Sequence, residues 1–275
     1  MPRSIRPRGA GVWTIKLSLF MVEIITKELM SPISEILYTD KKGDAMEKTF
    51  TPKVIIQVFV FIVLIPFLPI FITGDWGWLE AWIYALINIF AFLISRVLAF
   101  KKHPDLLKER AKMTEHDDAK SWDKVLSRIV GLGGGLMPLM AGLDIRGGWS
   151  NYAFSWGWKS VAILVIVLGF AFSTWALLEN RFFSGVVRIQ TERGHHVVDG
   201  GPYAWVRHPG YAGALFAYFA IPILFDSLYT FGVVTLFAIV LIIRTSLEDR
   251  TLQAELPGYA EFTKRTRYRL FPGIW

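Results

Sequence analysis

Four long apolar stretches dominate the pattern of hydrophobic and polar positions along the chain. They cover residues 54–73, 78–100, 125–145 and 156–178. At a rise of about 1.5 Å per residue, each is long enough to cross a hydrocarbon core of about 30 Å as a helix. The third is the weakest, because Arg128 and a glycine-rich run interrupt it. The pattern therefore predicts four transmembrane helices.

Two shorter apolar runs, 211–225 and 229–243, follow closely on one another with Asp-Ser-Leu between them. At about 15 residues each, they predict either a tilted helical hairpin or a pair of which one is only partly inserted. The expected fold is an all-α polytopic integral membrane protein with about five to six transmembrane helices. Residues 46–186 would hold the first four, and residues 187–275 would form a C-terminal region that contains the hairpin 211–243.

Positive charge separates the two sides of this predicted bundle. Cations are scarce on one side, where two of the three loops have none and the third has only Arg146; these loops are 74–77, 143–151 and 226–228. They are abundant on the other side, in the loop 101–124, the segment 179–210 and the tail 244–275. Because cytoplasmic loops carry an excess of Lys and Arg, we expect this second side and both termini to be cytoplasmic.

Composition supports a membrane protein and narrows its chemistry. The chain is 53% hydrophobic, with 21 Phe and 11 Trp, above the average for soluble domains. It has no cysteine, which excludes disulfides, cysteine–zinc sites and a thiol nucleophile. Its net charge of +7 lies at the ends of the apolar segments. Membrane lipid headgroups are therefore the expected partner rather than nucleic acid.

The first 45 residues form a separate N-terminal extension. They are basic and only mildly apolar, and they lack the apolar core and cleavage site of a signal peptide. Two interpretations stand side by side. The extension is a peripheral amphipathic helix, or the natural start is Met46 and the extension is dispensable.

Familiar nucleotide and metal signatures fail in this sequence. The run GLGGGL (131–136) has a leucine where a dinucleotide fingerprint needs its last glycine, and no strand precedes it. We expect it to serve close helix packing. The chain has no P-loop, no HExxH and no Gly-x-Ser-x-Gly elbow, and its five histidines are poorly spaced for a metal, so we predict no metal site.

The stretch GPYAWVRHPGYAG (201–213) is where polar chemistry meets the apolar pattern. An arginine and a histidine stand immediately before an apolar run, where charge is costly and usually functional. Pro209 biases His208 toward an extended conformation, which would hold its ring at the membrane boundary. Farther on, Arg244 and Glu248 share one helix face at i,i+4. One interpretation pairs them as a salt bridge and lets Arg207 and His208 bind lipid phosphate. The other makes the whole group a site for a polar ligand beside a lipophilic one.

At these residues the sequence resembles the isoprenylcysteine carboxyl methyltransferases and their bacterial and archaeal relatives. The motif Gly-Pro-Tyr-x-x-x-Arg-His-Pro-x-Tyr-x-Gly runs from Gly201 to Gly213, and a later Arg-x-x-x-Glu-(Glu/Asp) begins at Arg244. The stretch KSWDKVL (120–126) and the C-terminal ending also look like bacterial members. The resemblance is dense over 187–275 and looser over 54–186. Where the family usually has a second Glu, this chain has Asp249, which puts a role for that acid in doubt.

The resemblance implies a membrane methyltransferase that uses S-adenosylmethionine. It implies that Arg244 faces the methyl acceptor. The residues that match the family's cofactor-binding positions are Gln190, His195, Val197, Val198, Tyr203, His208, Pro209, Gly210, Tyr211 and Glu248.

The acceptor expected from this resemblance is lipophilic and enters from the bilayer, with an isoprenylcysteine-like carboxylate first in line. A carboxylate is already ionised at neutral pH and needs only orientation, for which Arg244 could act as a bidentate clamp. Three alternatives stay open: an NADPH-dependent membrane reductase of the sterol-reductase type, a phospholipid N-methyltransferase, and a non-catalytic lipid-binding scaffold. The reductase would be expected to carry a fuller His/Cys/Lys pattern after Glu248, which 248–259 lacks.

Overall fold

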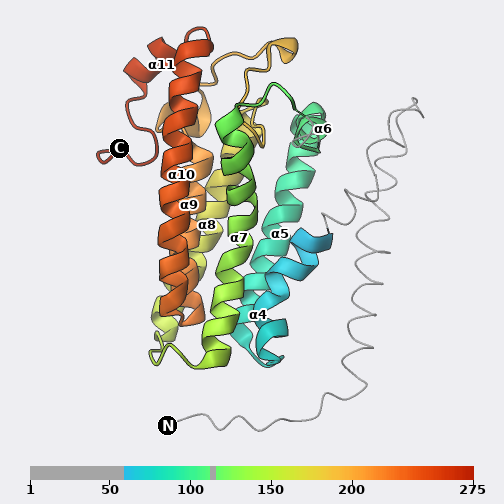
Figure 1. The fold of residues 1–275 in the computed structure, drawn as a ribbon, viewed down its shortest axis with the longest axis vertical. Helices are drawn as coiled ribbons and strands as arrows, with labels where there is room; N and C mark the ends of the chain where they lie inside the picture. Colours follow the sequence, from blue (N-terminus) through green and yellow to red (C-terminus); the bar gives the residue numbers. More distant parts are fainter. Residues whose placement is uncertain (1–58, 112–115) are drawn as a thin grey trace, which may run out of the picture. The chain divides into compact units, whose positions relative to one another are not determined.

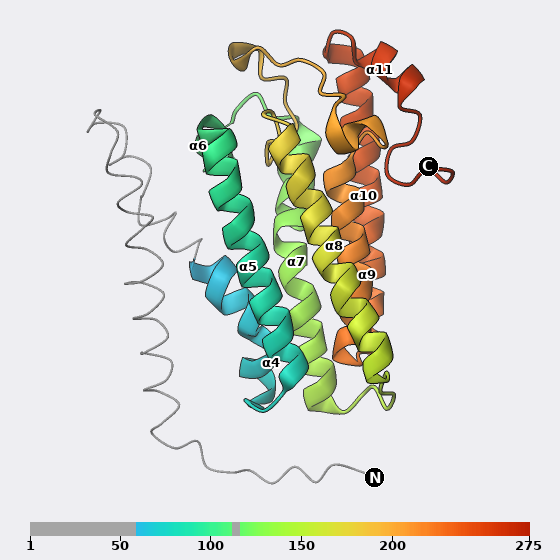
Figure 2. The same cartoon turned by 180° about the vertical axis from the view of Figure 1, so that it is seen from behind.

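The computed structural model describes residues 59–111 and 116–275, and the regular structure in this part of the chain is entirely helical (Figures 1 and 2). This confirms the all-α fold class. The predictions about residues 1–45 lie outside the described residues. In chain order the elements are a π-helical turn η2 (Val60–Leu64), α4 (Ile65–Thr73), α5 (Leu79–Lys102), α6 (Pro104–Ala111), α7 (Ser121–Gly147), α8 (Trp156–Glu179), the 3₁₀ turns η3 (Thr191–Arg193) and η4 (Gly201–Ala204), α9 (Pro209–Phe225), α10 (Leu228–Glu255) and α11 (Tyr259–Arg265).

Four of these helices, α5, α7, α8 and α10, are long and apolar enough to cross a membrane. Many of their large apolar side chains point outward: Leu132 is 69% exposed, Leu236 is 67% exposed and Leu168 is 58% exposed. Apolar surface on this scale is unusual for a soluble monomer and is what lipid-facing helices present. The fold is therefore consistent with a polytopic membrane protein. The helix α9 is apolar but shorter, at 17 residues.

The polar segments gather at one end of the helix bundle. Both cartoon views place α6, α11 and the connection between α8 and α9 at this end, while the turns after α4, α7 and α9 lie at the opposite end (Figures 1 and 2). The predicted grouping of the cation-rich segments on one side is thus confirmed. Within the loop 101–124, the structure adds a short helix, α6, and starts α7 already at Ser121.

The helical hairpin predicted for 211–243 is formed by two full helices, α9 and α10. Asp226 adopts a left-handed conformation (φ 57°), and the Ser227 side chain caps α10 by accepting a hydrogen bond from the Thr230 amide. The apolar run of the second helix stops at residue 243, but α10 continues to Glu255, so Arg244 and Glu248 lie on one helix as expected. Charged side chains do not end a helix by themselves, because Arg, Glu and Gln are good helix formers.

Alpha helices α8 and α9 pack closely because both carry a glycine at their crossing point. A β-carbon on Gly213 would lie 2.5 Å from the carbonyl oxygen of Gly169, and one on Gly169 would lie 2.5 Å from that of Gly213. Small residues permit such close backbone approach between membrane helices. The run 131–136 also allows close helix packing, because the ring of Phe237 on α10 lies where a β-carbon of residue 133 would be. The packing role expected for that run is confirmed.

Gly213→Ala is expected to lower the free energy of unfolding by about 1–3 kcal/mol, because the added methyl group forces the two helices apart. The matched control is Gly232→Ala on α10, where a β-carbon meets nothing within 4 Å. That substitution should be neutral or slightly stabilising. Thermal unfolding of both variants in the same detergent measures the difference. Equal melting temperatures for the two variants would contradict the proposed close contact.

A buried ion cluster ties the helices together at the end opposite the polar segments. The Lys159 ammonium on α8 lies 2.6 Å from a carboxylate oxygen of Glu80 on α5 and 2.5 Å from one of Asp226 in the α9–α10 turn. The lysine side chain is only 5% exposed. Two acids therefore neutralise a lysine that the apolar end of α8 would otherwise leave isolated.

Candidate functional site

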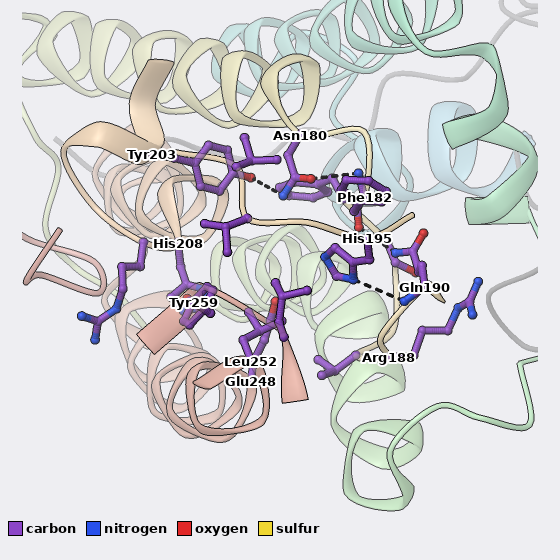
Figure 3. Close-up of a pocket in the computed structure, with 18 of the residues that line it drawn as sticks. Asn180, Phe182, Arg188, Gln190, His195, Tyr203, His208, Glu248, Leu252 and Tyr259 are labelled. Atoms are coloured by element: carbon purple, nitrogen blue, oxygen red, sulfur yellow. Dashed lines mark hydrogen bonds between the residues drawn. The ribbon is translucent and has the colours of Figure 1, made fainter. Parts of the chain in front are cut away.

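The polar end of the bundle contains a pocket lined by the connection between α8 and α9, the start of α9 and the last turns of α10 (Figure 3). Ten of the eleven residues predicted for the site line it, all except Pro209. They come from segments up to 58 residues apart, Gln190 to Glu248, so the sequence motifs converge in space. The residues are Gln190, His195, Val197, Val198, Tyr203, His208, Gly210, Tyr211, Arg244 and Glu248.

Pro209 has a different place: it is the first residue of α9. Its missing N–H costs nothing at this position, where no helical partner exists, and its fixed φ suits the helix start. His208 is the N-cap, with φ −126° and ψ 62°. It stands at the entrance to the helix as expected, but its backbone is not in the extended conformation that was predicted. The sequence suggested that the chain enters the membrane at Tyr211. The helix α9 instead starts two residues earlier, at Pro209.

One wall of the pocket is fixed by Asn180, the residue that ends α8. Its side-chain oxygen accepts from the Phe182 amide at 2.8 Å, and its side-chain nitrogen donates to the Tyr203 hydroxyl at 3.2 Å (Figure 3). Tyr203 is buried, and burial raises the pKa of its phenol well above the ordinary value. Tyr203 is therefore a neutral hydrogen-bonding group. The sequence motifs pointed to Tyr203 but not to Asn180 or Phe182.

Gln190 and His195 form a second, tightly connected corner (Figure 3). The His195 Nδ1 accepts from the Gln190 amide at 3.2 Å, and the Gln190 side chain donates to the Phe182 carbonyl at 2.9 Å. The His195 ring also packs on Phe182, with centroids 4.5 Å apart. Burial, helped by the positive charges of Arg188 and Arg193 nearby, lowers the pKa of His195 to about 4. At neutral pH the ring is uncharged, and because Nδ1 accepts, Nε2 carries the proton and is a donor.

Tyr211 links the two polar residues of α10 in the site. Its hydroxyl donates to a Glu248 carboxylate oxygen at 2.8 Å and accepts from Arg244 Nη1 at 2.7 Å. The ring is parallel to that of His208, with centroids 5.9 Å apart. The direct Arg244–Glu248 salt bridge, one of the two interpretations of their spacing, is therefore not formed. A tyrosine stands between them.

Arg244 instead pairs with Asp123 near the start of α7, an acid that the sequence analysis missed. Nε and Nη2 of the guanidinium lie 2.6 and 3.0 Å from the two carboxylate oxygens, and Nη2 also donates to the Gly185 carbonyl at 3.0 Å. Asp123 is fully buried and accepts from the Val187 amide at 2.6 Å. The two-pronged face that was expected to clamp an acceptor is thus taken by Asp123. The only signal for this acid was its place in KSWDKVL.

Asp249, whose role was in doubt, is the centre of a hydrogen-bond network whose members include the pocket residues Arg207, His208 and Tyr259. Its fully buried carboxylate receives both Nε and Nη2 of Arg207, at 2.8 and 3.0 Å, and Nε of Arg269 at 2.8 Å. The Tyr259 hydroxyl lies 3.1 Å away and His208 Nε2 lies 3.4 Å away. Asp249 therefore joins the Arg-His-Pro motif to the C-terminal tail behind the pocket.

Part of the pocket lining is an apolar cluster. Val197, Val198 and Leu252 pack against the buried side chains of Leu256 and Phe262 there. An apolar slot between polar corners suits a ligand with a flat aromatic part and charged or hydroxylated ends. Glu248 contributes a carboxylate oxygen, Oε1, for which the described residues provide no hydrogen-bond partner.

Comparison with known proteins supports the family resemblance. Residues 161–254, from α8 to the end of α10, match the family model described as the Isoprenylcysteine carboxyl methyltransferase (ICMT) family. The resemblance drawn from the motifs is thereby confirmed over this region. The chain is also similar to the uncharacterized protein YpbQ of Bacillus subtilis (strain 168), with 30% identity over 100 residues. That match covers 36% of this chain and 58% of YpbQ.

Proposed function

We propose that this chain is a membrane methyltransferase that uses S-adenosylmethionine and a lipophilic acceptor. Its residues 161–254 match the model of the isoprenylcysteine carboxyl methyltransferase family. The observation that carries the proposal is the pocket itself. Residues that the family motif marks as cofactor-binding, from three separate segments, line one cavity at one end of the bundle.

The chemistry of the pocket suits this cofactor. S-adenosylmethionine combines a flat adenine, ribose hydroxyls, a zwitterionic amino acid and a sulfonium cation. Val197, Val198 and Leu252 would pack against the adenine, and the Nε2 donor of neutral His195 would bond an acceptor atom. Glu248 would offer Oε1 to donor groups or to positive charge. When bound, the cofactor supplies the methyl group for transfer.

Catalysis by these residues would consist of positioning. Methyl transfer is an in-line displacement, so holding donor and acceptor in line provides most of the acceleration. Tyr211 is held on both sides, by Glu248 and by Arg244, and its ring lies against His208. Because Tyr211 is held in this way, it would keep a fixed position between the cofactor in the pocket and the methyl acceptor. A carboxylate acceptor needs no base there, whereas an amine would have to lose a proton first.

The orientation of the protein follows from the same proposal. The pocket end carries the cation-rich segments, so it would face the cytoplasm, where the water-soluble cofactor is present. The lipid chain of the acceptor would remain among the membrane helices.

Binding and transfer assays test the proposal directly. Calorimetry of the purified full chain with S-adenosylmethionine and with NADPH should show binding of the first only. Labelled methyl groups should then appear on a farnesylated N-acetylcysteine but not on phosphatidylethanolamine. Binding of NADPH instead would favour the reductase alternative and overturn the proposal.

Glu248→Gln is expected to weaken S-adenosylmethionine binding roughly ten- to hundredfold, the usual loss for one hydrogen bond to a charged group. The amide keeps the size of the side chain and can still accept from Tyr211. Glu255→Gln is the matched control, because Glu255 lies on the same helix but pairs at the surface with Lys120, at 2.6 Å. Calorimetry should find the control unchanged. If both variants bind like the unaltered protein, Glu248 does not contact the cofactor.

A further inference from the structure

Both ends of the Gln190 side chain are held by other residues of the chain. Its nitrogen donates to the Phe182 carbonyl at 2.9 Å, and its oxygen accepts from Nη1 of Arg193. Gln190 is only 1% exposed. Because a guanidinium has donors and no acceptor, the Gln190 atom that faces Arg193 has to be the oxygen, and the nitrogen is turned toward Phe182. Arg193 thereby determines which way this buried amide points.

A tight turn brings Arg193 and His195 onto Gln190. The 3₁₀ turn η3 ends at Gly194, whose left-handed backbone (φ 67°) reverses the chain. The His195 amide then donates to the Gln190 carbonyl at 3.2 Å, and the Gln190 amide donates to His195 Nδ1 at 3.2 Å (Figure 3). The guanidinium carbon of Arg193 lies 5.8 Å from the centroid of the Phe182 ring, on which His195 packs. The placement of Arg193 therefore bears on Gln190 and on Phe182.

Arg193 is held in turn by Asp105, which lies 88 positions earlier on the short helix α6. Nη2 of Arg193 lies 2.7 Å from Oδ2 of Asp105 and donates to the Arg181 carbonyl at 3.0 Å. The same Oδ2 accepts from Nε of Arg181 at 2.8 Å. Although partial burial acts to raise it, the two arginines lower the pKa of Asp105 to about 2, so the carboxylate is charged at neutral pH.

Asp105 and Arg193 stand outside the pocket itself. Among the described residues, the pocket lining includes Phe182, Gln190 and His195 but neither Asp105 nor Arg193. A change at Asp105 can therefore reach a molecule in the pocket only through the residues that it holds. The helix α6 also lies outside residues 161–254, which match the family model.

We infer that Asp105 and Arg193 are positioning residues for cofactor binding, because through the Gln190 side chain they fix the pocket wall formed by the Phe182 and His195 rings. The inference deepens the proposed function and rests on it for one point, that the molecule bound against this wall is S-adenosylmethionine. It gives α6 a part in cofactor binding, although α6 carries no residue that lines the pocket.

The first test compares two affinities on the full chain in detergent, for S-adenosylmethionine and for a farnesylated N-acetylcysteine. Asp105→Ala should weaken cofactor binding about tenfold, as expected for the loss of one charged hydrogen bond, and leave binding of the lipophilic acid unchanged. Asp105→Asn should restore most of the cofactor affinity, because its amide oxygen can still accept from Arg193. General loosening of the pocket end would instead lower both affinities together, and that result would overturn the inference.

Arg181→Gln is the matched control. It removes the other side chain that pairs with Asp105 and leaves in place both the backbone carbonyl of Arg181 and the contact of Arg193 with Gln190. Cofactor affinity should stay unchanged in this variant. Arg193→Lys keeps the positive charge, but one ammonium cannot bridge Asp105 and Gln190 as the guanidinium does, so it should behave like Asp105→Ala. It carries the test if Asp105→Ala fails to fold.

The ring of His195 gives a readout that does not depend on the ligand. In NMR spectra of histidine-labelled protein, with His195 assigned by His195→Gln, the unaltered protein and Arg181→Gln should show one tautomer, with the proton on Nε2. Asp105→Ala and Arg193→Lys should show both tautomers in exchange. Failure of the unaltered protein to bind S-adenosylmethionine would refute the proposed function, whereas the positioning of His195 is judged by these spectra. An unchanged His195 tautomer in both folded variants would overturn the inference.

Discussion

Replacing Asp249 with alanine is expected to lower the free energy of unfolding by about 3–5 kcal/mol, the cost of leaving a buried ion pair half broken. The substitution leaves the guanidinium groups of Arg207 and Arg269 without their carboxylate. Arg207 would keep only its bonds to the Thr266 and Arg267 carbonyls, at 3.1 and 3.0 Å. Thermal unfolding in detergent, followed by intrinsic tryptophan fluorescence, measures the loss.

The matched control for that experiment is Asp199→Ala. Asp199 also pairs with an arginine of the tail, Arg265, at 2.9 Å, but both side chains are at least half exposed. Exposed pairs contribute about 0–1 kcal/mol. A similar shift in melting temperature for the two variants would show that burial of the Asp249 network contributes nothing.

Backbone hydrogen bonds hold the C-terminal tail at the same place. The Arg207 and His208 amides donate to the Tyr268 and Arg269 carbonyls, each at 2.9 Å.

Arg244→Ala is expected to have a comparably large effect, for a reason that the sequence did not reveal. It leaves Asp123 buried with the Val187 amide as its remaining partner, which should cost about 3–5 kcal/mol. The segment 183–187, of which all residues but Gly185 line the pocket, would lose its hydrogen bond at the Gly185 carbonyl. Cofactor affinity and methyl transfer should therefore fall together. Arg244→Lys should rescue little, because one ammonium cannot span both carboxylate oxygens.

A double-mutant cycle separates this effect from a direct role in catalysis. Asp123→Ala and Arg244→Ala should each be destabilising, and the double variant should be much less destabilised than the sum of the two. Lys264→Ala, which breaks an exposed pair with Glu261, serves as the control for loss of a cation. Additive losses in the cycle would contradict the pairing. Normal stability and cofactor binding with lost turnover in Arg244→Ala would return the acceptor-binding role to Arg244.

The sequence predicted most of the helices because long apolar stretches leave few other solutions in a membrane. It also predicted which residues would meet at the pocket, since the motif residues of 190–211 and 244–248 converge there. It could not predict their partners. Arg244 and Asp123 are 121 positions apart, and Arg207 and Asp249 are 42 apart, so only the packing of α7, α9 and α10 brings them together.

The spacing of Arg244 and Glu248 shows why local rules were insufficient. An i,i+4 pair on an exposed helix gains only a few tenths of a kcal/mol. A buried carboxylate that accepts two parallel bonds is the stronger competitor for the guanidinium, and Asp123 provides it.

The ion cluster of Lys159 has a consequence for how the chain is inserted during synthesis. In the proposed orientation, Lys159 must be carried across the membrane, against the usual distribution of cations. Its first acid, Glu80, is made 79 residues earlier, so it has already been translocated on α5 when α8 follows. Its second acid, Asp226, comes 67 residues later, at the tip of the α9–α10 hairpin. Arrival of that tip would complete the cluster, so the far end of the bundle would close only when the helices that carry the pocket have been inserted.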